Sequence, residues 1–540
     1  MKAIKTTIYS LIAALGCAAF TGCDSFLEEY SQDLAKVNSW EDLDEVLLGD
    51  GYVKTGRVYV QNYSLYTEQD LNLDFLHFMT DEIVPADDKD QDIGFYSSMF
   101  PFITWQQDTG VDYQFRYVGG DEKAWNSLYS RINVCNMVIS LIDDQPEPHP
   151  SDKVQKTRVK GEAYFLRGLF YFILTNLYCE PYVPSTAEST VGMPIKWSEV
   201  IEDIEFQRAS LAESYDRILS DLKNAESLLA DTERKTIYRA DINTVRLLMS
   251  RVYLYMQDWE NAAAKAKEVL AANDRLLNLA TKTPGENCID TSSPEYIFSM
   301  GDYIVATAFV DDRKVVPAWN ISAEMINLLD RNDLRMGRYI GDTSYGRPNV
   351  FRKVNGQREA WGSYFPVGSI FTFRTPEAYL TLAEASAFLG EESTARSYLE
   401  RFIATRKSNK VTVTESGNDL IDLIRDERAR EFLLEGHRWF DLRRYTVCEP
   451  YPWSKVIEHG YNYYSGSYDD LDHTDWYRLE KNDGGYTLPI PRAIRNFQNS
   501  LGNANRPARA PYTTTQPVGG GDDDDDDWDD DDWDDDDWDW

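Results

Sequence analysis

The sequence predicts a mainly α-helical protein, in which tetratricopeptide-like helical hairpins form a scaffold that carries large irregular loop insertions. Two observations support this fold class. Apolar residues recur at helical spacing over several long segments, and two of these segments divide into pairs of helices with small residues where the helices would meet. Long stretches rich in Gly, Asp, Asn, Pro and aromatic residues separate them, with only short strand-like pieces.

Three long helices come before the hairpins. Residues 124–142 place Leu128, Ile132 and Cys135 on one helical face. Residues 154–178 are apolar around most of the circumference, which is typical of a buried helix. Residues 211–230 are amphipathic, with Tyr215, Ile218 and Leu222 on one apolar stripe.

The most specific element is a pair of helices over 242–256 and 259–271, joined by a two-residue turn. Alanines along the second helix would let the two helices approach closely, as in a tetratricopeptide unit. The pattern recurs over 376–406, about 130 residues later, so the copies do not form a tandem array. A last helix over 419–435 leads into "GHRWFDLRRY" (436–445).

The N-terminus has the layout of a secretory signal. A short basic stretch is followed by an apolar run that is too short to span a bilayer, and then by Cys23. "FTGC" is similar to the lipobox of bacterial lipoproteins, so we expect cleavage after residue 22 and lipidation of Cys23. An ordinary signal with an incidental cysteine, or a buried N-terminal helix, is the alternative.

Composition excludes several classes of function. The net charge of −36 argues against binding to nucleic acid or to anionic lipid. Fifteen of the acids lie in the tail 522–540, where tryptophans recur every five residues. We expect this tail to be disordered and solubilising, with a docking or divalent-cation-binding peptide as the alternative. Four scattered cysteines remain after residue 23; they are either buried apolar residues or form one or two disulfides.

Six segments in order resemble one family, the SusD/RagB-like nutrient-uptake lipoproteins of Bacteroidota outer membranes. The resemblance covers roughly residues 23–499, and it is strongest at "RDERAREFLLEGHRWFDLRRY" (425–445). The other segments are "CDSFLEE", "WNSLYSRINVCN", "GEAYFLRGLFYFILTNLYCEPYVP", "RVYLYMQDWENAAAKA" and "LPIPRAIRNFQN". Each segment alone is weak, and the shared order makes the resemblance specific.

The resemblance implies a non-catalytic lipoprotein on the outer face of the outer membrane, held there only by its lipid. The protein would capture an oligosaccharide, or alternatively an oligopeptide, and act as a lid that delivers it to a SusC-like TonB-dependent transporter barrel. The expected organisation is a signal peptide (1–22) and a SusD-like domain (23–500) with parts divided near residue 270. A linker (501–521) and the acidic tail (522–540) follow.

Aromatic side chains in the insertions are the best ligand-binding candidates, because flat rings stack on the C–H faces of sugars. We rank Trp105, Tyr113, Trp361 and Tyr364 highest by position, and Trp319 after them because it precedes a helix. Further aromatic residues of the insertions are Phe115, Tyr117, Tyr345, Tyr463, Tyr464 and Trp476. Packing within its own loop explains each ring equally well.

The densest charge cluster is expected to be structural. It includes Glu427, Arg428, Glu431, Arg438 and Asp441. A secreted glycosidase would need two facing carboxyl groups, but acids among so many arginines are held ionised.

No cofactor or metal is predicted, since the five histidines lack the spacing of metal ligands or of a catalytic triad. The acidic stretch 87–94 departs from the EF-hand pattern at two positions. A solvated loop is therefore expected there, with a structural divalent cation as the alternative.

Overall fold

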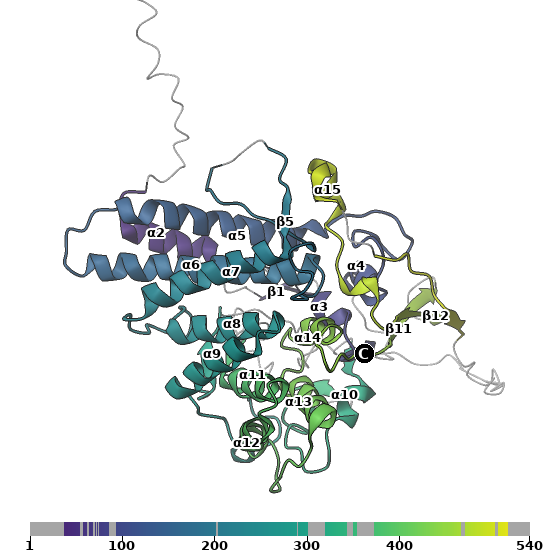
Figure 1. Ribbon diagram of the computed structural model, residues 1–540. Coiled ribbons are helices and arrows are strands. Elements are labelled where there is room, and N and C mark those ends of the chain that lie inside the picture. Colours follow the sequence, from purple (N-terminus) through teal and green to yellow (C-terminus); the bar gives the residue numbers. More distant parts are fainter. Residues whose placement is uncertain are drawn as a thin grey trace, which may run out of the picture.

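The computed structural model confirms the mainly α-helical, tetratricopeptide-like fold (Figure 1). It describes residues 37–53, 58–61, 64–67, 71, 73, 75–85, 93–200, 204–288, 290–300, 319–342, 349–353, 372–465, 470–502 and 506–516. The long helices are α5 (Glu122–Leu141), α6 (Asp152–Tyr178), α7 (Leu211–Leu229), α8 (Ile242–Tyr255), α9 (Trp259–Ala272), α11 (Thr375–Phe388), α12 (Glu392–Ile403) and α13 (Gly417–Glu431). The shorter helices are α2 (Trp40–Val46), α3 (Phe75–Phe78), α4 (Ile93–Ile103), α10 (Ala323–Asn327), α14 (Arg438–Tyr445) and α15 (Arg492–Phe497).

Helix α6 is the central helix of the upper layer in Figure 1, where it packs against α5 and α7. Most of its side chains are buried, as its apolar circumference predicts. Gly161 permits the close approach of α7, because a Cβ at this position would lie 2.8 Å from Cγ of Leu229. Helix α7 begins with a capping box, in which the Ser210 hydroxyl accepts from the backbone N–H of Glu213.

The two predicted hairpins lie side by side in the fold although they are far apart in the sequence. Helices α8 and α9 form the first pair, α11 and α12 form the second, and α9 packs directly on α11 (Figure 1). Left-handed backbone at Gln257 and at Gly390 makes the two turns. The alanines of the second helix in the first pair, Ala262 and Ala266, are fully buried as predicted.

The helix predicted over 419–435 ends earlier than expected. Helix α13 stops at Glu431, and the chain turns through left-handed backbone at Leu434 and Gly436 before α14 begins. The turn places Asp441 of α14 within 3.1 Å of Arg428 of α13.

The regions expected to be irregular contain more regular structure than the sequence indicates. Helices α3 and α4 lie in the region before α5, and a long β-hairpin lies in the region after α14. The strands are β1 (Val58–Gln61), β2 (Ser64–Thr67), β3 (Ile83–Pro85), β4 (Val191–Pro194), β5 (Arg208–Ser210), β6 (Tyr296–Phe298), β7 (Trp319–Ile321), β8 (Ile340–Gly341), β9 (Val350–Phe351), β10 (Phe373–Arg374), β11 (Ile457–Ser465), β12 (Asp470–Leu479) and β13 (Thr513–Thr515).

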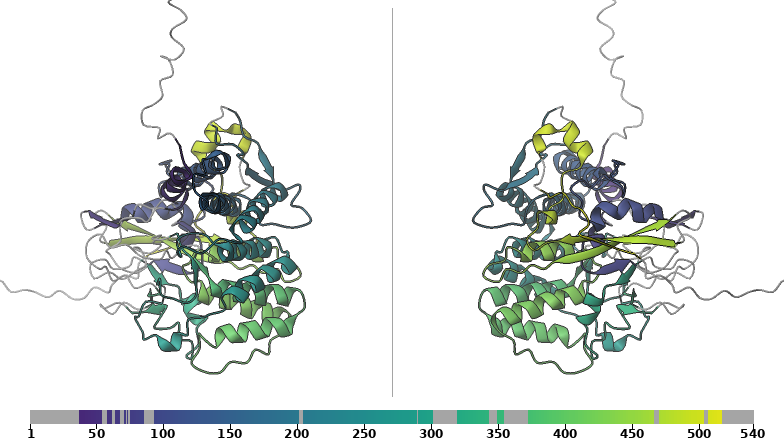
Figure 2. Two further views of the ribbon diagram at one scale, coloured as in Figure 1. Left: turned by 90° about the vertical axis from the view of Figure 1, so that its left-hand side faces the viewer. Right: turned by 90° about the vertical axis from the view of Figure 1, so that its right-hand side faces the viewer.

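The hairpin of β11 and β12 projects from the helical body, as Figures 1 and 2 both show. Strand β13 adds to the outer edge of β12, so the sheet order is β11–β12–β13 with antiparallel pairing throughout. The remaining strands pair two by two, and all of these pairs are antiparallel.

Part of the segment predicted as a linker, 501–521, is folded onto the domain. The Arg506 side chain is buried against the backbone of Trp105 and Thr487, and β13 pairs with β12. Three successive threonines favour extended backbone, and the free edge of β12 supplies the hydrogen-bonding partner. Contacts with the body of the protein therefore reach Thr515.

Several expectations fall outside the described residues. These are the signal peptide, Cys23, the acidic stretch 87–92 and the tail 522–540. The four cysteines that are described, Cys135, Cys179, Cys288 and Cys448, are buried free thiols. Among the described helices, none combines the length and the apolar character that crossing a membrane requires.

Candidate ligand-binding surface

The predicted charge cluster is a buried ion network between α13, α14 and the loops beside them. Glu431 accepts hydrogen bonds from Arg406 at 2.8 and 3.0 Å and from Arg374 at 3.0 Å. Glu427 pairs with Arg335 at 2.8 Å and with Arg430 at 2.6 Å. Both carboxylates are fully buried, so arginine side chains surround them instead of water.

The same network ties α14 to other elements. Asp441 lies between Arg428 and Arg444, at 3.1 and 2.7 Å. Arg438 donates to both carboxylate oxygens of Asp81, at 2.8 and 2.7 Å, and thereby fixes the chain after α3. These contacts give the cluster a structural role across elements that are distant in the sequence.

The arginines keep the acids ionised. Burial alone would raise the pKa of Glu431, but the guanidinium groups of Arg406 and Arg374 outweigh burial and hold this pKa well below its usual 4.5. The pKa of Glu427 is lowered in the same way by Arg335 and Arg430, against the opposing effect of burial. Neither carboxyl group is thus placed to donate a proton to a substrate.

Two of the predicted tryptophans lie in the core. The Trp105 ring is fully buried, its Nε1 donates to the Met79 carbonyl at 3.1 Å, and it stacks on His459 with ring centroids 4.4 Å apart. Trp319 lies in β7 and packs edge-on against Phe78 at 4.9 Å. With both rings covered by protein, neither offers a free face for stacking on a sugar.

Trp361 and Tyr364 lie outside the described residues, so their contact with ligand stays a prediction. Tyr113 is the one highly ranked aromatic that the structure describes at the surface, where it is half-buried. Its ring meets Tyr463 of β11 edge-on at 6.1 Å.

Tyr113 begins a row of rings along one face of the projecting hairpin. Tyr463 stacks on His473 of β12 with centroids 4.5 Å apart and an interplanar angle of 10°. Because side chains alternate along a strand, Tyr461, Tyr463, His473 and Asp475 share this face. Tyr461 is buried and anchors the row to the core, whereas the other three are half-buried. We call Tyr113, Tyr463 and His473 the aromatic row.

Polar groups accompany the row. Asp475 accepts from the Thr514 hydroxyl of β13 at 2.5 Å, and His473 Nδ1 lies 2.7 Å from the Asp472 carboxylate. Burial raises the pKa of the Tyr463 phenol, so the hydroxyl stays neutral and can donate a hydrogen bond. Half-buried rings beside carboxylates and hydroxyls suit a ligand with apolar faces and many hydroxyl groups.

The loop after Tyr113 is held in a fixed, strained shape. Asp112 Oδ1 accepts from the backbone N–H groups of Gln114 and Arg116 at 3.0 and 2.9 Å, and Oδ2 accepts from the Arg116 guanidinium at 2.9 and 2.7 Å. Phe115 adopts left-handed backbone with φ of 58° and is 55% exposed. Strain of this kind at an exposed bulky residue is frequent at binding sites.

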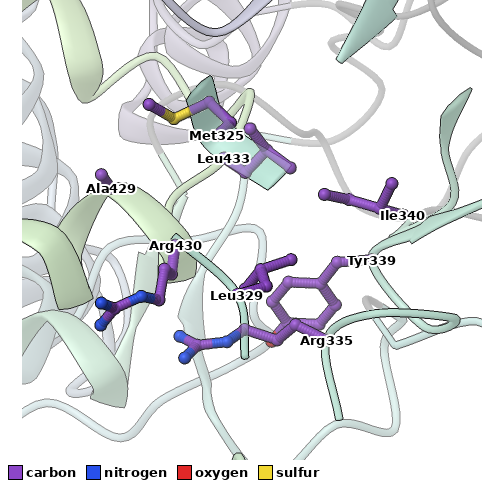
Figure 3. A pocket seen from close by; sticks show the side chains of 8 residues that line it. All are labelled: Met325, Leu329, Arg335, Tyr339, Ile340, Ala429, Arg430 and Leu433. Carbon is purple, nitrogen blue, oxygen red and sulfur yellow. The ribbon is translucent and has the colours of Figure 1, made fainter. Parts of the chain in front are cut away.

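A separate pocket lies beside the ion network (Figure 3). It encloses about 230 Å³, including its open mouth, and Arg335 and Tyr339 lie on one side with Ala429 and Arg430 of α13 on another. The part of this space that a water-sized molecule could occupy is only about 10 Å³, far below the roughly 300–1,000 Å³ of typical ligand pockets. None of the predicted ligand-binding residues lines it.

Sequence reasoning missed the contribution of the hairpin. Tyr463 is one of several unranked aromatic residues of the insertions, and His473 is not among the candidates, because the sequence patterns used above do not predict the hairpin. The signal is nevertheless present: most alternate residues of "IEHGYNYYS" (457–465) and "DLDHTDWYRL" (470–479) are aromatic or apolar.

Comparisons with known proteins agree on one family. The family model described as "Starch-binding associating with outer membrane" matches residues 86–254, and the model described as "SusD family" matches residues 332–505. Together they cover more than half of the chain. The chain is 24% identical over 387 residues to SusD-like protein P38 of Formosa agariphila, covering 59% of this chain and 71% of that protein. A SusD-like protein of Bacteroides ovatus is 19% identical over 366 residues, 59% and 64% of the two chains.

Solved structures show the same fold. A putative sugar binding protein from Bacteroides vulgatus superposes with a TM-score of 0.65 at 20% identity, over 87% of this chain and 99% of that one. A SusD superfamily protein from Bacteroides thetaiotaomicron gives 0.64 at 19% identity, over 87% and 100%. At such identities the likeness extends to the fold alone.

Proposed function

This chain belongs to the SusD/RagB-like family, and from that premise we propose that it is a non-catalytic binding protein of the cell surface that captures an oligosaccharide. The observation that carries the proposal is the aromatic row, in which half-buried rings lie beside carboxylate and hydroxyl groups on a projecting hairpin. A rigid helical body that presents such side chains is suited to binding. The acids of the ion network are held ionised by arginines, which supports a role without catalysis.

We further propose that Cys23 carries the lipid that holds the protein at the outer face of the outer membrane. There it would act as a lid on a SusC-like TonB-dependent transporter barrel and deliver its cargo by closing. The apolar run before Cys23 and the acids after it support lipid attachment at the outer face of the outer membrane. Incorporation of labelled palmitate by the wild type, and its loss in Cys23→Ala, tests the anchor.

Calorimetry with the full mature chain tests cargo binding. Oligosaccharide fragments are titrated in one series and peptide pools in another. Removing one ring of the row, in Tyr113→Ala or Tyr463→Ala, is expected to weaken oligosaccharide binding by about 2 kcal/mol, which is close to thirtyfold.

Tyr398→Ala is the matched control. Tyr398 is also a half-buried tyrosine and is also paired with another tyrosine ring, but it lies on α12, far from the row (Figure 1). We expect the Tyr398→Ala variant to bind oligosaccharide with the affinity of the wild type. If peptides bind and sugars do not, the cargo is an oligopeptide. If both row variants bind sugars with wild-type affinity, the aromatic row is not part of the binding site.

A further inference from the structure

The two most exposed large apolar side chains of the described residues, Phe497 and Trp197, lie on another part of the surface. Phe497 at the end of α15 is 79% exposed, and Trp197 is 65% exposed. Val200 and Ile204, at 58% and 50%, lie on the same segment as Trp197. We call these four residues the α15 ridge. Helix α15 and the segment that leads into β5 stand together at the top of the molecule in Figures 1 and 2.

Hydrogen bonds join the two halves of the ridge. Gln498, next to Phe497, donates from Nε2 to the Ile204 carbonyl at 3.1 Å, and its Oε1 accepts from the Phe206 backbone N–H at 2.9 Å. The Ser500 hydroxyl donates to the Phe206 carbonyl at 2.8 Å. The ends of α15 and of the 204–206 segment are thus fixed to each other across almost 300 residues of sequence.

The Trp197 half is fixed to the helical body. Asn136 of α5 donates to the carbonyls of Lys196 and Ser198, at 3.2 and 3.1 Å. The Arg217 guanidinium of α7 lies against the Trp197 ring, 4.0 Å from its centroid. An exposed ring held this firmly contributes little to folding, but it loses little conformational entropy when a partner covers it. Rigid Trp and Phe side chains beside arginine are typical anchors of protein interfaces.

The position of the ridge limits what can cover it. Helix α2, near which the described chain begins, and α15 both lie in the upper part of the molecule in Figures 1 and 2. With lipid on Cys23, the 14 residues up to Val37 span at most roughly 48 Å. The ridge and the first described residues therefore lie in the same upper part of the molecule, so a lipid on Cys23 would keep the ridge within reach of the membrane and of proteins embedded in it.

Charge favours a protein over the lipid itself. Glu199 and Glu205 flank the Trp197 half, and an anionic lipid surface would repel them. Arg492 and Arg495 lie on α15 at the other half, so the apolar tips are bordered by both signs of charge. Surfaces of this kind pair with a protein that carries the opposite arrangement.

We infer that the α15 ridge docks on the outward-facing surface of a membrane-embedded protein, namely the transporter barrel of the proposed function, on which this inference rests. Trp197 and Phe497 are the two anchors. The barrel should offer apolar recesses for them, with basic groups facing Glu199 and Glu205 and acidic groups facing α15. The ridge is separate from the aromatic row, so docking and cargo binding can be disturbed independently.

The test is co-purification from detergent-solubilised outer membranes of the host, with the tagged full-length chain as bait and the retained barrel identified by mass spectrometry. The double variant Trp197→Ala/Phe497→Ala is expected to retain at least tenfold less barrel than the wild type. The control Met336→Ala/Leu389→Ala removes two exposed apolar side chains away from the ridge and should retain the wild-type amount. Calorimetric affinity for oligosaccharide fragments and the thermal midpoint should be unchanged in both.

The outcomes distinguish failure of the α15 ridge as a docking surface from failure of the proposed transporter role. Equal barrel retention by the ridge variant and the wild type overturns the ridge as the docking surface and leaves the transporter role intact. If the wild type retains no barrel, the proposed transporter role fails and the inference fails with it. If the ridge variant keeps the barrel but no longer binds protein-free vesicles of extracted outer-membrane lipid, the occupant is lipid and the inference is wrong.

Discussion

Replacing Glu431 with Gln tests whether the buried ion network holds the α13–α14 corner together. The substitution keeps the shape of the side chain but removes its charge, and it leaves the guanidinium groups of Arg406 and Arg374 without their shared carboxylate. Arg374 retains Glu295 and Glu435, and Arg406 retains Glu295, so the loss is partial for both arginines. Breaking a buried pair from one side typically costs about 3–5 kcal/mol of folding free energy.

Chemical denaturation followed by circular dichroism measures this cost. The matched control is Glu392→Gln, which removes the charge from the solvent-accessible pair of Glu392 with Arg396 on α12 and should leave the stability close to that of the wild type. The pKa of Glu431 is lower in the folded state than its unfolded value of 4.5. Its contribution is therefore complete above about pH 4.5 and is lost as the pH falls below it. Equal stability of the two variants at pH 7 would refute the structural role of the network.

Three further predictions concern packing. Arg443→Met should destabilise the fold by about 2–4 kcal/mol in denaturant melts, because the buried guanidinium donates to the backbone carbonyls of Asn176, Cys179 and Tyr486, which would lose their partner; a stability equal to that of the wild type would contradict this. Gly192→Ala should destabilise by at least about 1–3 kcal/mol, since the new Cβ would lie 2.2 Å from a backbone oxygen, whereas Gly49→Ala meets nothing within 4 Å and serves as the control. Asp112→Ala should make the loop around Phe115 accessible to limited proteolysis, and a cleavage rate equal to that of the wild type would show that the loop is held by other contacts.

Local sequence patterns predicted the helical part of the fold. Residues 154–178 are apolar around most of the helix and must be buried, and the alanines of the first hairpin favour close packing of two helices. Helix α6 and the α8–α9 pair accordingly end within two residues of their predicted bounds. The end of α13 was placed four residues too late, because the residues after Glu431 have helical propensity and the turn depends on contacts of the folded protein.

The candidate site was less accessible to sequence reasoning. Whether a loop tryptophan faces ligand or core depends on partners far along the chain: Trp105 is covered by His459, which is more than 350 residues away. The same long-range pairing brings Tyr113 next to Tyr463. Composition identified the right kind of residue, but only the hairpin of β11 and β12 determines which rings come together at the surface.

Capture of an intact oligosaccharide can be checked by mass spectrometry of the ligand that stays with the full-length protein when it is purified from the surface of its host. We expect an intact oligosaccharide with the wild type, and at least a tenfold lower recovery with Tyr463→Ala. Recovery of a peptide, of cleaved sugar products, or of equal amounts of oligosaccharide from both proteins would contradict this expectation.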